Sequence, residues 1–190
     1  MKKRAARFPL LVYTPLRRWG SLGLLTALVV GAFWLWMPRI LGPTPLRPLA
    51  LLAVLAGGVL FVYGRFAPRV AHVRCEPAGL RLQGPLMPLL LSYRRVEGTR
   101  LSPMAKVFDP RKDRAARRWP PAYWGMTAVL VDLKGYPVPP WWLRLWFDRH
   151  LFLPNGTGLV LLVEDWLGLS QQLDGALSAY RARRSKSRAV

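Results

Sequence analysis

The stretch WGSLGLLTALVVGAFWLWM, residues 19–37, decides the fold of this chain. It carries no charge, and a helix rising about 1.5 Å per residue would span about 28 Å here, close to the hydrocarbon thickness of a bilayer. A second apolar run, PLALLAVLAGGVLFVYG at residues 48–64, would span about 25 Å and is flanked by Arg47 and Arg65. The segment between the runs is short and rich in proline, which favours a turn. The sequence therefore predicts a two-helix transmembrane hairpin over residues 19–64.

A cleavable signal peptide is the alternative reading of the first run. The region before that run is long, and no small-x-small cleavage site follows FWLWMPRIL. We therefore interpret the run as a membrane span. Residues 1–18 are then predicted to be a basic cytoplasmic tail.

The distribution of charge predicts the orientation of the hairpin. The chain has 29 Lys and Arg against 9 Asp and Glu, a formal net charge of +20, and its first acidic residue is Glu76. The segment between the two apolar runs holds only two cations. The flanks on the other side hold nine: Lys2, Lys3, Arg4, Arg7, Arg17 and Arg18 before the first run, and Arg65, Arg69 and Arg74 after the second. Because cytoplasmic flanks are enriched in Lys and Arg, we expect a multi-pass protein of the cell (inner) membrane with both termini in the cytoplasm.

Small residues recur on one face of each predicted helix. Gly23, Ala27 and Gly31 follow one another every four residues in the first helix, and Ala53 and Gly57 do so in the second. Such faces allow two helix backbones to approach closely in lipid. We expect these residues to pack the two helices against each other or against another copy of the chain.

The remaining chain, residues 65–184, has the pattern of a small domain of strands followed by a helix. The strand signals are a hairpin over 70–83, an apolar run at 86–96 containing Pro88, a run from Thr127 to Leu133, an alternating WWLRLWF at 141–147 and LVLLV at 159–163. After Asp165, spacings of three and four place Trp166, Leu169, Leu173, Leu177 and Tyr180 on one stripe of an amphipathic helix. Residues 185–190 are predicted to be a disordered tail.

Taken with the two spans, this order of elements resembles the bacterial pleckstrin-homology-like (PH-like) membrane proteins. The pattern is carried by Gly79-Leu80 after an extended strand and by the aromatic-polar strand Tyr93-Arg94-Arg95-Val96. The resemblance implies an α+β chain in which a partly open, bent antiparallel barrel of about seven strands is closed by the C-terminal amphipathic helix. The chain departs from that pattern by a long basic loop at residues 102–126.

Residues able to support catalysis or metal binding are scattered. His72 and His150 stand far apart, and Cys75 is the single cysteine, which indicates a core residue rather than a reactive thiol. The carboxylates Asp132, Asp148, Glu164 and Asp165 follow no catalytic motif, and no glycine-rich phosphate loop is present. We therefore predict no enzymatic activity, no cofactor and no metal.

The basic loop contains RKDRAARRWPPAYW at residues 111–124, in which a run of cations is followed by aromatic residues. A domain tethered to two spans would hold this loop near the bilayer, so anionic phospholipid headgroups are favoured over nucleic acid, for which no recognition motif is seen. The predicted contact residues are Lys106, Arg111, Lys112, Arg114, Arg117, Arg118, Trp119, Trp124 and Arg144.

These observations predict a membrane-anchored, cytoplasm-facing binding or scaffolding module. Its partners would be the lipid bilayer and a protein partner or a second copy of the chain. One alternative is a subunit or assembly factor of a larger membrane complex. The other is a membrane-associated enzyme.

Overall fold

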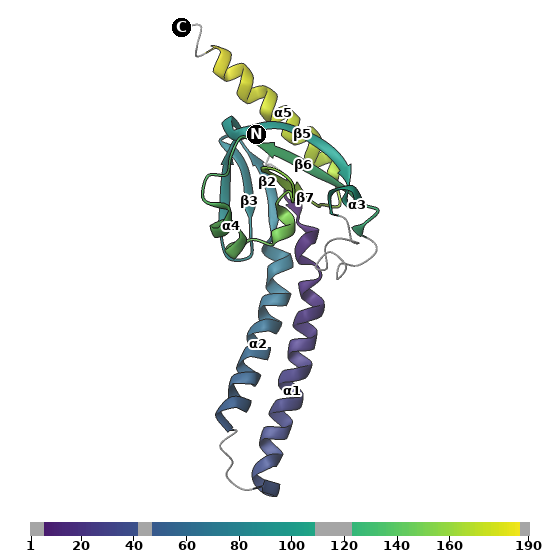
Figure 1. Ribbon diagram of the computed structural model, residues 1–190, viewed down its shortest axis with the longest axis vertical. Helices are drawn as coiled ribbons and strands as arrows, with labels where there is room; N and C mark the ends of the chain where they lie inside the picture. The colour runs from purple at the N-terminus through teal and green to yellow at the C-terminus, as the bar shows by residue number, and fades with distance from the viewer. Residues whose placement is uncertain (1–5, 42–46, 109–122, 187–190) are drawn as a thin grey trace. The chain divides into compact units, whose positions relative to one another are not determined.

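The computed structural model describes residues 6–41, 47–108 and 123–186. It divides into two compact units (Figure 1). The helix unit comprises Tyr13–Arg69, and the sheet unit comprises Met1–Val12 together with Val70–Val190. The helix unit extends beyond the predicted hairpin of 19–64 at both ends, because its two helices continue past the uncharged runs.

The helix unit consists of α1 (Leu16–Leu41) and α2 (Arg47–Val70), which run side by side (Figure 1). By length and composition, both helices are apolar enough to cross a membrane, with mean hydropathies of 1.6 and 2.0 in their most apolar regions. Their outer faces carry exposed apolar side chains: Leu28 is 63% exposed and Val59 is 69% exposed. Neither helix therefore has the enclosed surface of a helix in the core of a soluble protein.

The sheet unit begins with a strand that the sequence did not predict. β1 (Phe8–Pro9) pairs antiparallel with β2 (His72–Glu76), with Phe8 opposite Val73, and the short 3-10 helix η1 (Leu11–Tyr13) follows it. Phe8, Leu10, Val12 and Tyr13 are buried. The region predicted as a basic tail over residues 1–18 therefore contributes a strand and core side chains, because its apolar segment FPLLV lies within the sheet unit.

β1 and β2 belong to a four-stranded antiparallel sheet in the order β1-β2-β3-β4. β3 (Gly79–Gln83) and β2 form the hairpin predicted over residues 70–83, which is confirmed. β4 (Pro88–Ser92) pairs with β3, so Pro88 starts this strand instead of interrupting it. Leu80, Leu82 and Leu91 are fully buried and form the core beneath this sheet.

The predicted strand through Tyr93-Arg94-Arg95 is wrong. These residues form the 3-10 helix η2 (Tyr93–Arg95), and the Ser92 hydroxyl caps it by accepting a hydrogen bond from the Arg94 amide over 3.3 Å. η2 separates β4 from β5 (Val96–Pro103) because the 3-10 backbone cannot continue the strand ladder. The chain then enters a second antiparallel sheet.

The second sheet has the order β5-β6-β7. β6 (Thr127–Leu133) matches the predicted strand, and β7 (Gly158–Leu161) covers most of the other. Together with the first sheet this gives seven strands in the described residues, but they form two sheets and no closed barrel. The structure confirms an α+β unit with antiparallel sheets, and the partly open, bent barrel implied by the resemblance stays a prediction.

The last helix, α5 (Trp166–Lys186), contacts both sheets through β2 and β6. Leu169, Leu173 and Leu177 are buried, as the stripe predicted. The Asp165 carboxylate accepts a hydrogen bond from the Gly168 amide over 2.8 Å and so caps the start of the helix. The predicted amphipathic helix is confirmed.

The segment WWLRLWF is helical, which contradicts the predicted strand. α4 (Pro140–Trp146) starts with a proline at its first position, and its buried residue Leu143 is followed four positions later by buried Phe147. Leu145, expected on the same face as Leu143 in a strand, is 65% exposed. The apolar period is therefore four, and Pro140 favours the helix start.

Two short helices complete the described fold. α3 (Met104–Val107) follows β5, and its Ala105 amide donates to the Trp124 carbonyl over 3.4 Å. η5 (Arg149–Leu151) lies between α4 and β7. Gly156, in the predicted Asn-Gly turn before β7, has a φ of 131°, a conformation that favours glycine.

Candidate functional site

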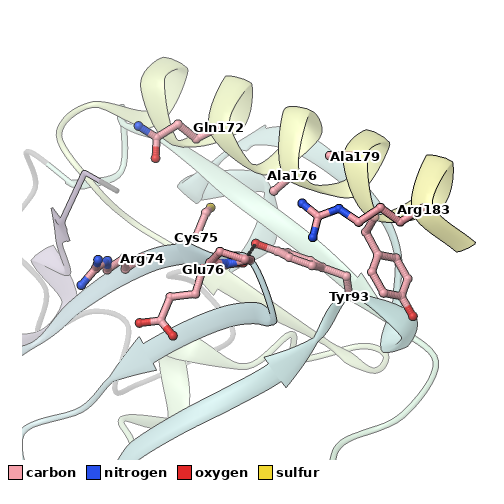
Figure 2. Close-up of a pocket in the computed structure, with 10 residues that line it drawn as sticks. Arg74, Cys75, Glu76, Tyr93, Gln172, Ala176, Ala179 and Arg183 are labelled. Atoms are coloured by element: carbon pink, nitrogen blue, oxygen red, sulfur yellow. Dashed lines mark hydrogen bonds between the residues drawn. The ribbon is translucent and has the colours of Figure 1, made fainter. Parts of the chain in front are cut away.

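A cleft of about 520 Å³ lies in the sheet unit between α5 and the end of β2 (Figure 2). We call it the α5 cleft. Its lining residues come from β2, the turn that follows, η2 and one face of α5: Arg74, Cys75, Glu76, Pro77, Tyr93, Gln172, Ala176, Ala179, Tyr180 and Arg183. Two small residues of α5, Ala176 and Ala179, leave space opposite the end of β2, and larger side chains of the same helix border that space.

Tyr93 organises the wall of the cleft. As the first residue of η2 it is only 2% exposed, and its hydroxyl donates a hydrogen bond to the Glu76 carbonyl over 2.9 Å. Its ring lies 6.0 Å from the ring of Tyr180 on α5, with the planes tilted by 52°. The 3-10 turn that replaces the predicted strand thus brings this tyrosine between β2 and α5.

Two titratable groups of the cleft, the Cys75 thiol and the Tyr93 phenol, are held neutral. Burial raises the pKa of the Cys75 thiol to about 11, although a hydrogen bond with the Tyr93 side chain opposes that shift. Burial also raises the pKa of the Tyr93 phenol, and Cys75 and Glu76 add to the effect. At neutral pH neither group is an anionic nucleophile, which agrees with the prediction that Cys75 is a core residue.

Charged side chains lie at the edge of the cleft. Arg74 and Arg183 are cationic. Glu76 also lines the cleft, and its carboxylate lies 3.6 Å from the guanidinium of Arg81, which does not line it. The Arg74 Nε is buried and has no hydrogen-bond partner among the described residues. The α5 cleft therefore combines a small-residue floor with two guanidinium groups, an arrangement suited to binding an acidic ligand.

The predicted lipid-contact residues are only partly within the described chain. Lys106 is exposed on α3, Trp124 is half-buried beside it, and Arg144 is exposed on α4, a separate element. The others lie outside the described residues: Arg111, Lys112, Arg114, Arg117, Arg118 and Trp119. The lipid contact of this loop stays a prediction.

A group of cations that sequence reasoning did not single out lies at the end of α5. Arg94, Lys134, Arg181 and Arg184 line a crevice of about 370 Å³ together with one acid, Glu97. Arg181 also donates to the Glu97 carbonyl over 3.2 Å. The sequence offered one signal for this group: Arg181 and Arg184 are three residues apart, a spacing that places both on one face of a helix.

The small residues of the two long helices lie between α1 and α2. A Cβ added at Gly57 would stand 2.6 Å from the Gly23 carbonyl oxygen and 2.9 Å from the Ala27 Cβ. Gly31 lies near Val54, since a Cβ added at Gly31 would be 3.7 Å from the Val54 Cγ2. Ala53 is half-buried.

Sequence reasoning missed a further close approach of Gly20 to Gly64, where an added Cβ on Gly64 would be 2.9 Å from the Gly20 Cα. Gly64 lies seven residues after Gly57, which was the signal for it.

Three of the four carboxylates considered as catalytic candidates have structural contacts. Asp132 pairs with Arg100 at 2.9 Å, and Asp165 caps α5. Asp148 accepts from the His150 amide over 2.8 Å and lies 2.7 Å from His150 Nδ1, while that ring stacks edge-on against Phe108. No group of three or more His, Cys, Asp or Glu residues that could hold a metal occurs in the described part of the chain.

Comparisons of this chain with family models, with curated proteins and with solved structures gave no match. The resemblance to PH-like membrane proteins stays a prediction from the pattern of elements.

Proposed function

We propose that the chain is a two-span membrane protein whose sheet unit is a PH-like binding or scaffolding module facing the cytoplasm. One observation carries this proposal: α1 and α2 contact each other through glycine backbones, while large apolar side chains cover their outer faces. Leu25, Phe33 and Leu35 are each at least 60% exposed. An apolar surface of this kind is unfavourable in water and favourable in the hydrocarbon core of a bilayer.

The pairing of β1 with β2 supports two crossings. Phe8 precedes both helices and Val73 follows both, yet the two residues are opposite each other in one sheet. Residues that share a sheet must be on the same side of a membrane, which two spans satisfy and one span does not. The same pairing argues against removal of the N-terminal region as a signal peptide.

The cytoplasmic orientation is supported by the cations next to the spans. Arg17 and Arg18 precede the first uncharged run, and Arg65 and Arg69 follow the second. These residues are on the side of the sheet unit by chain connectivity, and clustered Lys and Arg favour the cytoplasmic side.

The PH-like proposal is supported by the order and packing of elements in the sheet unit. Two antiparallel sheets, of four and three strands, are followed by one C-terminal helix that contacts both. A strongly bent, open barrel would have its strands divided in this way.

We propose binding as the role of the sheet unit, because the α5 cleft holds two guanidinium groups and its one carboxylate, Glu76, is paired with Arg81 outside the lining. Its ligand would be an acidic segment of a partner protein, recognised by Arg74 and Arg183. The exposed cations, among them Lys106 and Arg144, would contact anionic headgroups together with the basic loop.

Membrane extraction tests the first part of the proposal. The full chain is expected to stay in the pellet after an alkaline carbonate wash, and trypsin is expected to cut within residues 111–118 only in inside-out vesicles. Recovery in the wash would overturn the spans, and cleavage only in right-side-out vesicles would overturn the orientation.

Site-specific crosslinking tests the binding role. A photocrosslinker at Ala176, which lines the cleft, is expected to capture a protein partner, whereas one at exposed Gly175 is not. Arg183→Glu is expected to abolish the capture at Ala176. Equal capture from both positions, or capture unaffected by Arg183→Glu, would contradict the cleft as the site.

A further inference from the structure

A cavity of about 470 Å³ lies within the helix unit, near the start of α1 and the last third of α2. Its floor includes Gly20 and Phe61, and its lining carries three arginines: Arg17 and Arg18 from the first turn of α1 and Arg65 from α2. The floor exists because Gly20 approaches α2 so closely that an added Cβ would be 3.3 Å from the Phe61 carbonyl oxygen. We call this the arginine cavity.

The three guanidinium groups have no nearby acid in the sequence to neutralise them. No Asp or Glu precedes Glu76, so the whole helix unit, Tyr13–Arg69, is free of acidic residues. Arg17 and Arg18 also stand at the helix N-terminus, where the macrodipole is positive and cations are unfavourable. The cavity therefore has a concentrated positive potential that an anion would relieve.

The position of these arginines indicates which anion. Arg18 directly precedes the uncharged run 19–37, and Arg65 directly follows the run 48–64. If both runs lie in hydrocarbon, these are the depths at which phospholipid phosphates lie. Phe61 adds an apolar side chain next to the guanidinium groups, as expected for a ligand that joins a phosphate to acyl chains.

We propose that the arginine cavity binds the phosphate of an anionic phospholipid. Guanidinium groups suit this role because they donate paired hydrogen bonds to phosphate oxygens. The inference rests on the proposed membrane insertion of α1 and α2, and it assigns a lipid site distinct from the basic loop of the sheet unit.

Lipid retention by the purified full chain tests the site. The chain is equilibrated in detergent with equal amounts of phosphatidylglycerol and phosphatidylcholine, and bound lipid is measured by native mass spectrometry. Wild type is expected to retain phosphatidylglycerol in preference to phosphatidylcholine. The variant R17Q/R18Q/R65Q is expected to retain about tenfold less phosphatidylglycerol than wild type. The matched control R7Q/R81Q/K186Q removes the same charge from exposed positions of the sheet unit that line neither the α5 cleft nor the arginine cavity, and it is expected to retain lipid like wild type.

Further measurements separate the outcomes. Ser21→Leu keeps all three arginines but fills part of the cavity, so it is expected to weaken retention even if the triple variant does not insert. Three results would overturn the inference. The triple variant and its control could lose equal amounts of bound phosphatidylglycerol, or wild type could show no preference between the two lipids. An equal concentration of glycerol phosphate could also displace all of the bound phosphatidylglycerol. Carbonate extraction of wild type, carried out first, reports separately on the proposed spans.

Discussion

The Tyr93 hydroxyl donates a hydrogen bond to the Glu76 carbonyl over 2.9 Å, joining η2 to the end of β2. The two residues are 17 positions apart, and the intervening chain forms β3 and β4. This bond holds the Tyr93 ring against Tyr180 of α5 and so fixes one wall of the α5 cleft.

Removing that hydroxyl is expected to destabilise the sheet unit. Tyr93→Phe leaves the Glu76 carbonyl without its donor and should lower the free energy of unfolding by about 1 kcal/mol. The measurement is denaturant unfolding of the full chain in detergent, followed by near-ultraviolet circular dichroism. Tyr180→Phe keeps the ring contact and should change stability by less than about 0.5 kcal/mol. Equal losses for the two variants would show that the Tyr93 bond has no special role.

Alkylation of Cys75 should be slow in the folded chain. Because burial raises the pKa of its thiol from 9.0 to about 11, the thiolate fraction at pH 8 is about a hundredfold smaller than in the unfolded chain. Iodoacetamide labelling followed by mass spectrometry is expected to show at least that ratio of rates, and the folded rate should rise with pH.

The same shift predicts how stability depends on pH. The raised pKa means that the folded state holds the thiol proton more tightly than the unfolded state. The contribution of Cys75 is therefore complete below pH 9 and is lost as the pH rises from 9 through 11. The Cys75→Ser variant should show a weaker pH dependence in this window, and an unchanged dependence would contradict the assignment.

Adjacent glycines in α2 offer a matched test of helix packing. Gly57→Ala would place a methyl group 2.6 Å from the Gly23 carbonyl oxygen, whereas Gly58→Ala would meet no atom within 4 Å. We expect the first change to destabilise the helix pair by about 1–3 kcal/mol and the second to be neutral or stabilising. Unfolding in mixed micelles of mild detergent and dodecyl sulfate measures the difference, and equal effects would place the helix contact elsewhere.

Two leucines of α4 distinguish the observed helix from the predicted strand. Leu143 is 1% exposed and Leu145 is 65% exposed, whereas a strand would place both on one face. Leu143→Ala should cost about 2–5 kcal/mol of stability, and Leu145→Ala should cost less than about 0.5 kcal/mol. Comparable losses in thermal unfolding would favour the strand.

The start of α5 depends on a side-chain cap. Asp165→Ala removes the acceptor for the Gly168 amide and should cost about 1 kcal/mol. Glu164→Ala removes an adjacent exposed carboxylate that does not cap the helix and serves as the control for charge. Stability lost equally in both variants would indicate a general effect of charge.

The features that could be predicted from the sequence depend on residues close together in the chain. The two long helices follow from uncharged runs, the Gly23, Ala27 and Gly57 contact follows from helical spacing, and the stripe Leu169–Leu177 identified α5. In each case neighbours in sequence supply the periodicity, so no knowledge of distant partners is needed.

The features that were missed depend on distant partners or on ambiguous periods. β1 is two residues long and is fixed by Val73, 65 positions after Phe8, so no local pattern marks it. In α4 the spacing of four between Leu143 and Phe147 fits a strand or a helix, Leu145 favours the strand, and Pro140 was the signal for the helix. The α5 cleft joins Cys75 to Arg183 across more than a hundred residues, so it follows from topology alone.

The strand β1 has a consequence for biosynthesis. Phe8 leaves the ribosome before either long helix, but its partner Val73 emerges only after both helices have been made. β1 can therefore pair with β2 only after both long helices have been synthesised. An affinity tag placed shortly before Phe8 would be carried next to a folding sheet, so a tag is better placed after Lys186.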